Sequence, residues 1–137
     1  MEKEITLNSE IGFADFLSAE STREIVDCHT FSDGNWKQLT RQNNFPENIK
    51  KHIFPVNINY ANFVVLTEVD PEVKVRPHIH DEPMFRYVLK GTFHLNGKYY
   101  EEGDWVFVPA GVPYEMETQT GYTTLGCYGV HCTDPDI

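Results

Sequence analysis

Short runs with strand character fill the chain after residue 55, and they limit the fold more than any other feature. They are VNINYANFVVLTEVD, VKVRPHIH, MFRYVLKG, TFHLNGKYY, DWVFVPAG, PYEMETQ and GYTTLGCYGVH. These runs are rich in valine, tyrosine, phenylalanine and threonine, and Asn-Gly, glycine and proline separate them. Many short strands at near-even spacing are typical of an antiparallel all-β sandwich or barrel.

The clearest local signal is the dipeptide Asn96-Gly97. A two-residue type I′ hairpin needs positive φ at both central residues, which asparagine and glycine tolerate. We therefore expect TFHL to pair with KYYE as an antiparallel hairpin.

The first 55 residues have a different character. In GFADFLSAEST, Phe13, Phe16 and Leu17 lie at helical spacing, so a short helix is expected there, followed by strands at REIVD and NWKQLT. We expect residues 1–55 to form an extension that packs on a barrel of residues 56–137. With 137 residues, the chain is long enough to bury the core of a single domain.

The composition excludes several classes of function. Eleven Lys and Arg against 21 Asp and Glu give a net charge of -10, which argues against a nucleic-acid partner. The chain has neither a signal-peptide pattern nor a run of about 18 apolar residues, so we expect a cytoplasmic protein without a membrane partner. The three cysteines, Cys28, Cys127 and Cys132, lack a Cys-x-x-Cys spacing and indicate no disulfide framework or zinc ribbon.

The candidate site begins with His78 and His80. Alternate residues of a strand share a face, so the two imidazoles are placed to bind one ion. The spacing alone also fits two ordinary surface histidines. His29, His52 and His94 are set aside, the last because it alternates with the apolar residues of its own strand.

The surrounding residues resemble the cupin family. His78-Ile79-His80 and Gly91 fit its first motif, and Gly103, Pro109 and Gly111 fit its second motif, with the hairpin between the two motifs in place. The resemblance covers residues 73–117. It implies a small antiparallel jelly-roll barrel whose histidines point into the mouth, and exposed sheet edges that favour a homodimer.

Two positions depart from the family pattern. Met84 stands where cupins have a glutamate ligand, and Tyr114 stands where they have the second-motif histidine. HIHDEPMFRYVLKG is similar to the acetylacetone and 2,4′-dihydroxyacetophenone dioxygenases, which also lack the glutamate but bind iron with three histidines. A methionine sulfur contributes little to binding a hard divalent ion.

Three residues are candidates for a third ligand. Tyr114 occupies the family's ligand position, where it is either a ligand or a barrel-lining phenol that hydrogen-bonds substrate or water. Glu82 follows His80 in a bend and can complete a two-histidine, one-carboxylate site, or it is a solvated turn residue. His131 lies on the last expected strand, where it is either close to the pocket or exposed near the C-terminus.

Arg86 shares a face with the histidines if its strand alternates regularly. A buried arginine needs an anionic partner. That partner is either a protein carboxylate, such as Glu82 or Glu115, or a carboxylate, enolate or phosphate on a ligand. A bulge at Pro83 that turns the side chain outward is the third alternative.

These features together predict a metal-binding cupin that acts as an oxygenase on a carbonyl-containing or aromatic small molecule, anionic where Arg86 binds it. His78, His80 and Glu82 would bind the metal, Fe(II) if the protein is catalytic and otherwise zinc, nickel or manganese. Tyr114 and Arg86 would be the catalytic side chains. The alternative is a non-catalytic module that senses a ligand or metal, similar to the zinc-holding cupin domains of anti-sigma factors. A cupin whose metal site has decayed is the third possibility.

Overall fold

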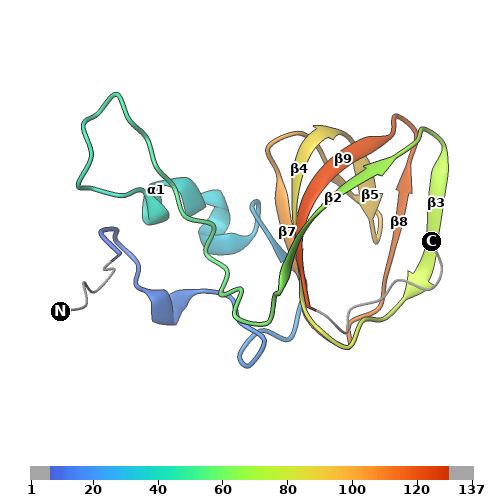
Figure 1. The fold of residues 1–137 in the computed structure, drawn as a ribbon, viewed down its shortest axis with the longest axis horizontal. Coiled ribbons are helices and arrows are strands. Elements are labelled where there is room, and N and C mark those ends of the chain that lie inside the picture. Colours follow the sequence, from blue (N-terminus) through green and yellow to red (C-terminus); the bar gives the residue numbers. More distant parts are fainter. Residues whose placement is uncertain (1–6, 130–137) are drawn as a thin grey trace.

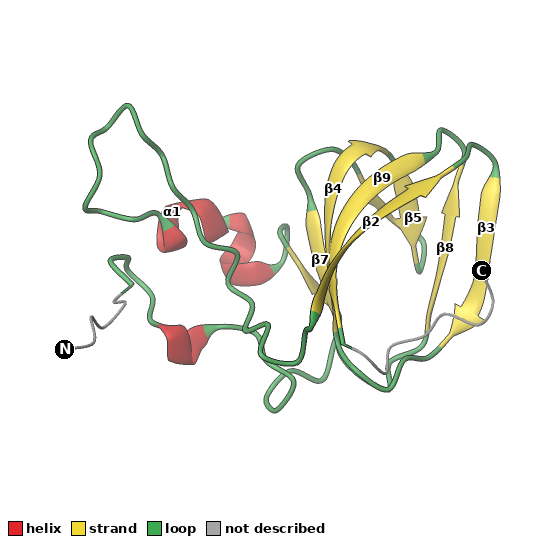
Figure 2. Cartoon of the chain, in the orientation of Figure 1, coloured by secondary structure: helices red, strands yellow, loops and turns green. Residues whose placement is uncertain are grey.

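The computed structural model describes residues 7–129, in which nine strands pair into two antiparallel sheets (Figures 1 and 2). The five-stranded sheet has the order β1 (Val26–Asp27), β7 (Trp105–Val108), β4 (Met84–Gly91), β9 (Tyr122–Tyr128) and β2 (Phe63–Val69). The four-stranded sheet has the order β3 (Val73–His78), β8 (Tyr114–Thr118), β5 (Phe93–Leu95) and β6 (Lys98–Tyr100). The antiparallel β prediction is confirmed, whereas closure of the two sheets into a barrel stays a prediction.

The Asn-Gly hairpin is also confirmed. Strands β5 and β6 pair antiparallel with Leu95 opposite Lys98. Between them, Asn96 has a φ of 50° and Gly97 a φ of 80°, the two positive values that this turn type requires.

The main core lies between the two sheets, because its members come from both. It consists of Val75, Met84, Val88, Phe93, Leu95, Tyr100, Val106, Val108, Tyr114, Met116 and Tyr122. Strand alternation in the sequence predicts seven core residues, and the last five of them belong to this core: Phe63, Val65, Val88, Phe93, Leu95, Val106 and Val108. Phe63, also expected there, is 55% exposed, and Val65 is half-buried. The expectation for Phe63 is wrong because β2 is an edge strand, with β9 as its one neighbour in the sheet.

A second apolar cluster covers the other face of the five-stranded sheet. It joins Cys28, Trp36 and Val56 to Phe85 on β4 and to Trp105 and Phe107 on β7. Strand β7 is therefore buried on both faces, which explains why its sequence WVFV is apolar throughout instead of alternating. Figure 1 shows the segment before β2 gathered on one side of the strands. The domain boundary at residue 55 stays a prediction.

The N-terminal segment differs most from expectation. The helix expected in residues 12–22 is a single 3-10 turn, Phe13–Asp15. Residues Trp36–Thr40, expected as a strand, form the α-helix α1. Trp36 and Thr40, one turn apart, are both buried, and the indole stacks on Phe54 with ring centroids 5.2 Å apart. Tertiary packing of an i, i+4 pair thus outweighs the local strand pattern.

Within residues 7–129, no helix has the length and apolarity needed to cross a membrane. The exposed side of the β2–β9 pair carries apolar side chains, among them Val64, Leu66 and Leu125. Such a strip favours association, but the homodimer stays a prediction.

Gly91, at the end of β4, has a φ of 80° and faces the backbone of the turn before β9. A Cβ at this position would overlap the carbonyl oxygen of Gly121 and lie 2.8 Å from Cα of Tyr122. We expect Gly91→Ala to lower the free energy of unfolding by about 2–4 kcal/mol, because left-handed strain and overpacking add.

Gly97→Ala is the matched control, since Gly97 has the same φ of 80° and a Cβ there would meet no atom within 4 Å. It should cost about 1–2 kcal/mol, from backbone strain alone. Denaturant unfolding measures the stability of both variants. Equal losses in the free energy of unfolding would show that the close approach of Gly91 to the backbone of Gly121 and Tyr122 does not contribute.

Candidate functional site

The two motif histidines and the two positions that depart from the cupin pattern meet where β3 ends and where β4 and β8 begin. His78 ends β3 and pairs with Tyr114 at the start of β8. The ring of His80 follows in the loop, with its centroid 4.9 Å from that of His78, and the Tyr114 ring lies 4.3 Å from His78. Met84 begins β4 and is buried. Side chains from three separate strands and one loop therefore form a single cluster.

Hydrogen bonds fix the orientation of these rings. His78 Nδ1 lies 2.8 Å from the backbone carbonyl of Arg76, which can only accept, so Nδ1 carries a proton. His80 Nε2 and the Tyr114 hydroxyl are 2.9 Å apart. The same hydroxyl lies 3.4 Å from Met84 Sδ, so it bridges the imidazole and the thioether.

These residues do not fit the four-ligand metal centre that the cupin fold implies. The donor set is two imidazoles, a phenol and a thioether, and the thioether already accepts a hydrogen bond from the cationic Arg86 Nη2 at 3.3 Å. Within residues 7–129, the two histidines form no group with a third His, Cys, Asp or Glu whose ligand atoms all lie within 4.8 Å. Metal binding by His78 and His80 stays a prediction.

Of the two other candidate ligands, Glu82 belongs to the described chain and His131 does not. Glu82 is half-buried in the loop before β4, and its buried Oε2 lies against Gly129, where a Cβ would overlap it. In the described part of the chain, Oε2 has no hydrogen-bond partner. His131 lies outside the described residues, so its expected role stays a prediction.

Arg86 is buried, with 4% of its surface exposed. Its Nη1 donates to the Tyr122 hydroxyl at 3.3 Å, and Nη2 donates to the Tyr128 hydroxyl at 2.6 Å. Nε has no acceptor, and no carboxylate forms an ion pair with the guanidinium, among the residues that the structure describes. The register shift of β4 lies between Val88 and Lys90, away from Pro83.

The guanidinium remains charged in this environment. Burial lowers the pKa of Arg86, but the phenols of Tyr128, Tyr122 and Tyr114 raise it, and the net shift is upward. The cluster is therefore a permanent positive charge surrounded by neutral hydroxyl groups.

A cavity of about 500 Å³ lies elsewhere, beside the outer face of the five-stranded sheet. Its lining includes Phe13, Phe16, Phe54, Phe85 and Cys127. Burial raises the pKa of the Cys127 thiol, so this lining offers no ready nucleophile, acid or base. We therefore place the candidate site at the histidines and Arg86.

One group of ligating side chains could not be found from the sequence. Cys28, His29 and Asp104 have ligand atoms that all lie within 4.8 Å of one another. Cys28 and Asp104 are 76 residues apart, and only the pairing of β1 with β7 brings them together. No local spacing could have identified this group.

Residues 31–131 match the family model described as the ChrR Cupin-like domain. No curated protein matches the chain. The similar solved structures include an RmlC-like cupin from Shewanella frigidimarina NCIMB 400, with 21% identity, a TM-score of 0.47, and coverage of 65% of this chain and 92% of that one.

Two other solved structures are similar over part of the chain. For KdgF from a Halomonas species, identity is 21%, the TM-score is 0.42, and coverage is 64% of this chain and 84% of that one. For the conserved SPY1581 protein of unknown function from Streptococcus pyogenes, identity is 17%, the TM-score is 0.41, and the match covers 48% of this chain and 62% of that one. The family model, and not these likenesses, carries the assignment.

Tyr114→Phe tests whether the phenol holds the cluster together. Loss of the hydroxyl removes its bonds to His80 and Met84 and should lower the free energy of unfolding by about 1–2 kcal/mol. Tyr99→Phe is the control, because this exposed hydroxyl bonds the nearby Glu101 at 3.3 Å, and it should leave unfolding unchanged. Equal denaturation midpoints for the two variants would contradict a structural role of the Tyr114 hydroxyl.

Proposed function

The chain belongs to the ChrR cupin-like domain family, and from this premise we propose that it is a small-molecule-binding cupin whose ligand is an anion held by Arg86. One observation carries the proposal. The guanidinium is buried, charged and bonded to hydroxyl groups and a thioether, with no carboxylate partner among residues 7–129.

The buried guanidinium lacks a countercharge among residues 7–129. Phenols accept hydrogen bonds from a guanidinium but do not neutralise it, and an uncompensated buried charge costs several kcal/mol. A ligand carboxylate, enolate or phosphate supplies the countercharge, and the planar donor set of arginine suits two oxygens of one such group. Nε, which lacks an acceptor in the described residues, is the donor available to it.

The neighbouring side chains suggest how the rest of the ligand is held. Met84 Sδ accepts from both Arg86 and Tyr114, and Tyr114 bonds His80, so a continuous polar path leads from the guanidinium to the histidines. A ligand that extends along this path would meet aromatic faces and ring nitrogens of His78 and His80. This pattern favours a short acid with a flat or carbonyl-containing body.

The second candidate is a metal-dependent oxygenase that acts on a dicarbonyl or aromatic ketone. Its support is the tautomer of His78, whose Nδ1–H bond to a backbone carbonyl is the arrangement common in metal-binding histidines. The donor set at Met84 and Tyr114 weighs against it, so we rank it second. The test measures dioxygen consumption with added Fe(II) across a panel of ketones. Consumption by the unmodified chain that is absent from a His78→Ala/His80→Ala double variant would rank the oxygenase above the anion-binding cupin.

Ligand preference tests the anion proposal directly. In titration calorimetry, short aromatic and aliphatic carboxylates should bind the protein at least about tenfold more tightly than their primary amides, which corresponds to about 1.4 kcal/mol. Arg86→Leu should remove this preference, and Arg86→Lys should restore it only in part, because an ammonium is a point charge without the planar donor set.

Arg23→Leu is the control, since Arg23 is exposed and donates to backbone carbonyls of its own turn. It should retain the preference of the unmodified chain. Equal binding of acids and amides by the unmodified chain, or an undiminished preference in folded Arg86→Leu, would contradict the proposal.

A further inference from the structure

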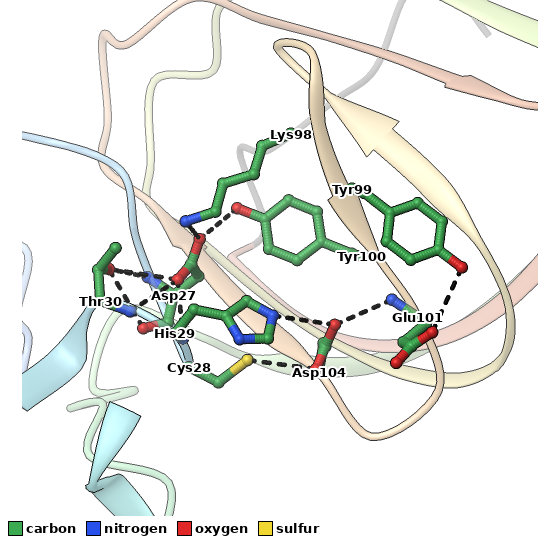
Figure 3. A network of polar contacts seen from close by, with 9 residues as sticks. All are labelled: Asp27, Cys28, His29, Thr30, Lys98, Tyr99, Tyr100, Glu101 and Asp104. Carbon is green, nitrogen blue, oxygen red and sulfur yellow. Dashed lines mark hydrogen bonds and ion pairs between the residues drawn. The ribbon is translucent and has the colours of Figure 1, made fainter. Parts of the chain in front are cut away.

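The turn after β1 and the turn before β7 place three ligating side chains together. Asp27 pairs with Val106 in the β1–β7 register, and the next residue, Cys28, donates its N–H to the Trp105 carbonyl at 3.1 Å. This pairing brings the Cys28 thiol beside Asp104, and His29 reaches the same carboxylate (Figure 3).

The ligand atoms lie close enough together to approach one ion. Cys28 Sγ lies 3.5 Å from Asp104 Oδ1, and His29 Nε2 lies 3.2 Å from the other oxygen, Oδ2. One ligand atom from each of the three residues lies within 4.8 Å of the other two. Around Zn²⁺, with bonds of about 2.3 Å to sulfur and about 2.0–2.2 Å to nitrogen and oxygen, ligand atoms are about 3.3–3.5 Å apart. We propose that Cys28, His29 and Asp104 bind Zn²⁺ or a similar borderline transition-metal ion.

A buried carboxylate holds two of the ligands in place. Asp27, 2% exposed, accepts hydrogen bonds from the backbone N–H groups of His29 at 2.9 Å and Thr30 at 3.0 Å. The same side chain forms an ion pair with Lys98 at 2.6 Å and accepts from the Tyr100 hydroxyl at 2.5 Å (Figure 3). The turn that carries the cysteine and the histidine is thereby anchored to strand β6.

The third ligand is positioned independently. Asp104 Oδ2 accepts the backbone N–H of Glu101 at 2.9 Å, which fixes the carboxylate within the turn between β6 and β7. Supporting hydrogen bonds of this kind orient metal ligands and raise affinity.

Exposure allows an ion to enter. Cys28 is 6% exposed, whereas the side chains of His29 and Asp104 are 52% and 15% exposed. The three protein ligands leave a fourth position for water on the His29 side. A thiolate with an imidazole favours zinc and similar ions over magnesium or calcium, and binding releases the thiol proton to solvent.

The site lies where the N-terminal segment joins the sheet, so a bound ion would link residues 76 positions apart in sequence. An ion that binds the folded chain alone stabilises it by mass action. This inference does not depend on the anion proposal, because none of its residues belongs to the Arg86 cluster.

Cobalt substitution provides the test. The full chain, stripped with a chelator, should bind one equivalent of Co²⁺, with the intense visible bands of tetrahedral cobalt and a sulfur-to-cobalt charge-transfer band, and Zn²⁺ should displace it. Cys28→Ser should lose the charge-transfer band. Each of the variants Cys28→Ser, His29→Gln and Asp104→Asn should weaken Co²⁺ binding on the order of 100-fold or more, because losing a ligand costs at least as much affinity as losing a residue that only orients a ligand.

Two controls separate this site from the other cysteines and histidines. Cys127→Ser and the His78→Ala/His80→Ala double variant should bind Co²⁺ as the unmodified chain does. Zn²⁺ should also raise the unfolding temperature of the unmodified chain and leave that of Cys28→Ser unchanged. Three results would each overturn the proposal. They are a lack of stoichiometric Co²⁺ binding, a charge-transfer band that is retained in folded Cys28→Ser, and loss of that band in the double histidine variant.

Discussion

A charged guanidinium within the apolar space between two sheets is the constraint around which the candidate site is arranged. Arg86 extends from β4, the strand that lies between β7 and β9, and its hydrogen-bond partners Tyr122 and Tyr128 come from β9. Because neutral hydroxyl groups solvate this charge without neutralising it, the site differs from a cupin centre that holds a cation. The same charge explains why a methionine and a tyrosine are compatible with the usual ligand positions. Met84 Sδ accepts a hydrogen bond from Arg86, and the Tyr114 hydroxyl donates to Met84 Sδ.

Strand β7 connects this site to the rest of the molecule. One face of β7 packs into the main core, and the other packs against Trp36 and Phe85 on the outer face of the five-stranded sheet. Its N-terminal end adjoins Asp104, and its partner β1 leads into Cys28 and His29. The anion cluster and the proposed zinc site thus share no residue, so each can be changed by mutation with little direct effect on the other.

The sequence predicts those features that depend on near neighbours. Asn96-Gly97 specifies its hairpin through positive φ, and the alternation of β5 places His94 outside and Phe93 inside. The sequence does not predict features that depend on residues far apart in the chain. Trp36 becomes helical because its ring packs on Phe54 and Trp105, Phe63 is exposed because its strand lies at a sheet edge, and the Cys28–Asp104 contact needs the β1–β7 pairing. The pattern of neighbouring residues in the sequence does not predict those contacts.

The most direct test of the central claim is a high-resolution crystal structure of the full chain grown with a small aromatic carboxylate. We expect electron density for the acid between the sheets, with one carboxylate oxygen within hydrogen-bond distance of Arg86 Nε and the rest of the acid against His78, His80 and Tyr114. A structure in which a carboxylate of the protein itself pairs with Arg86, or in which the acid binds elsewhere and leaves Arg86 without an anion, would contradict it.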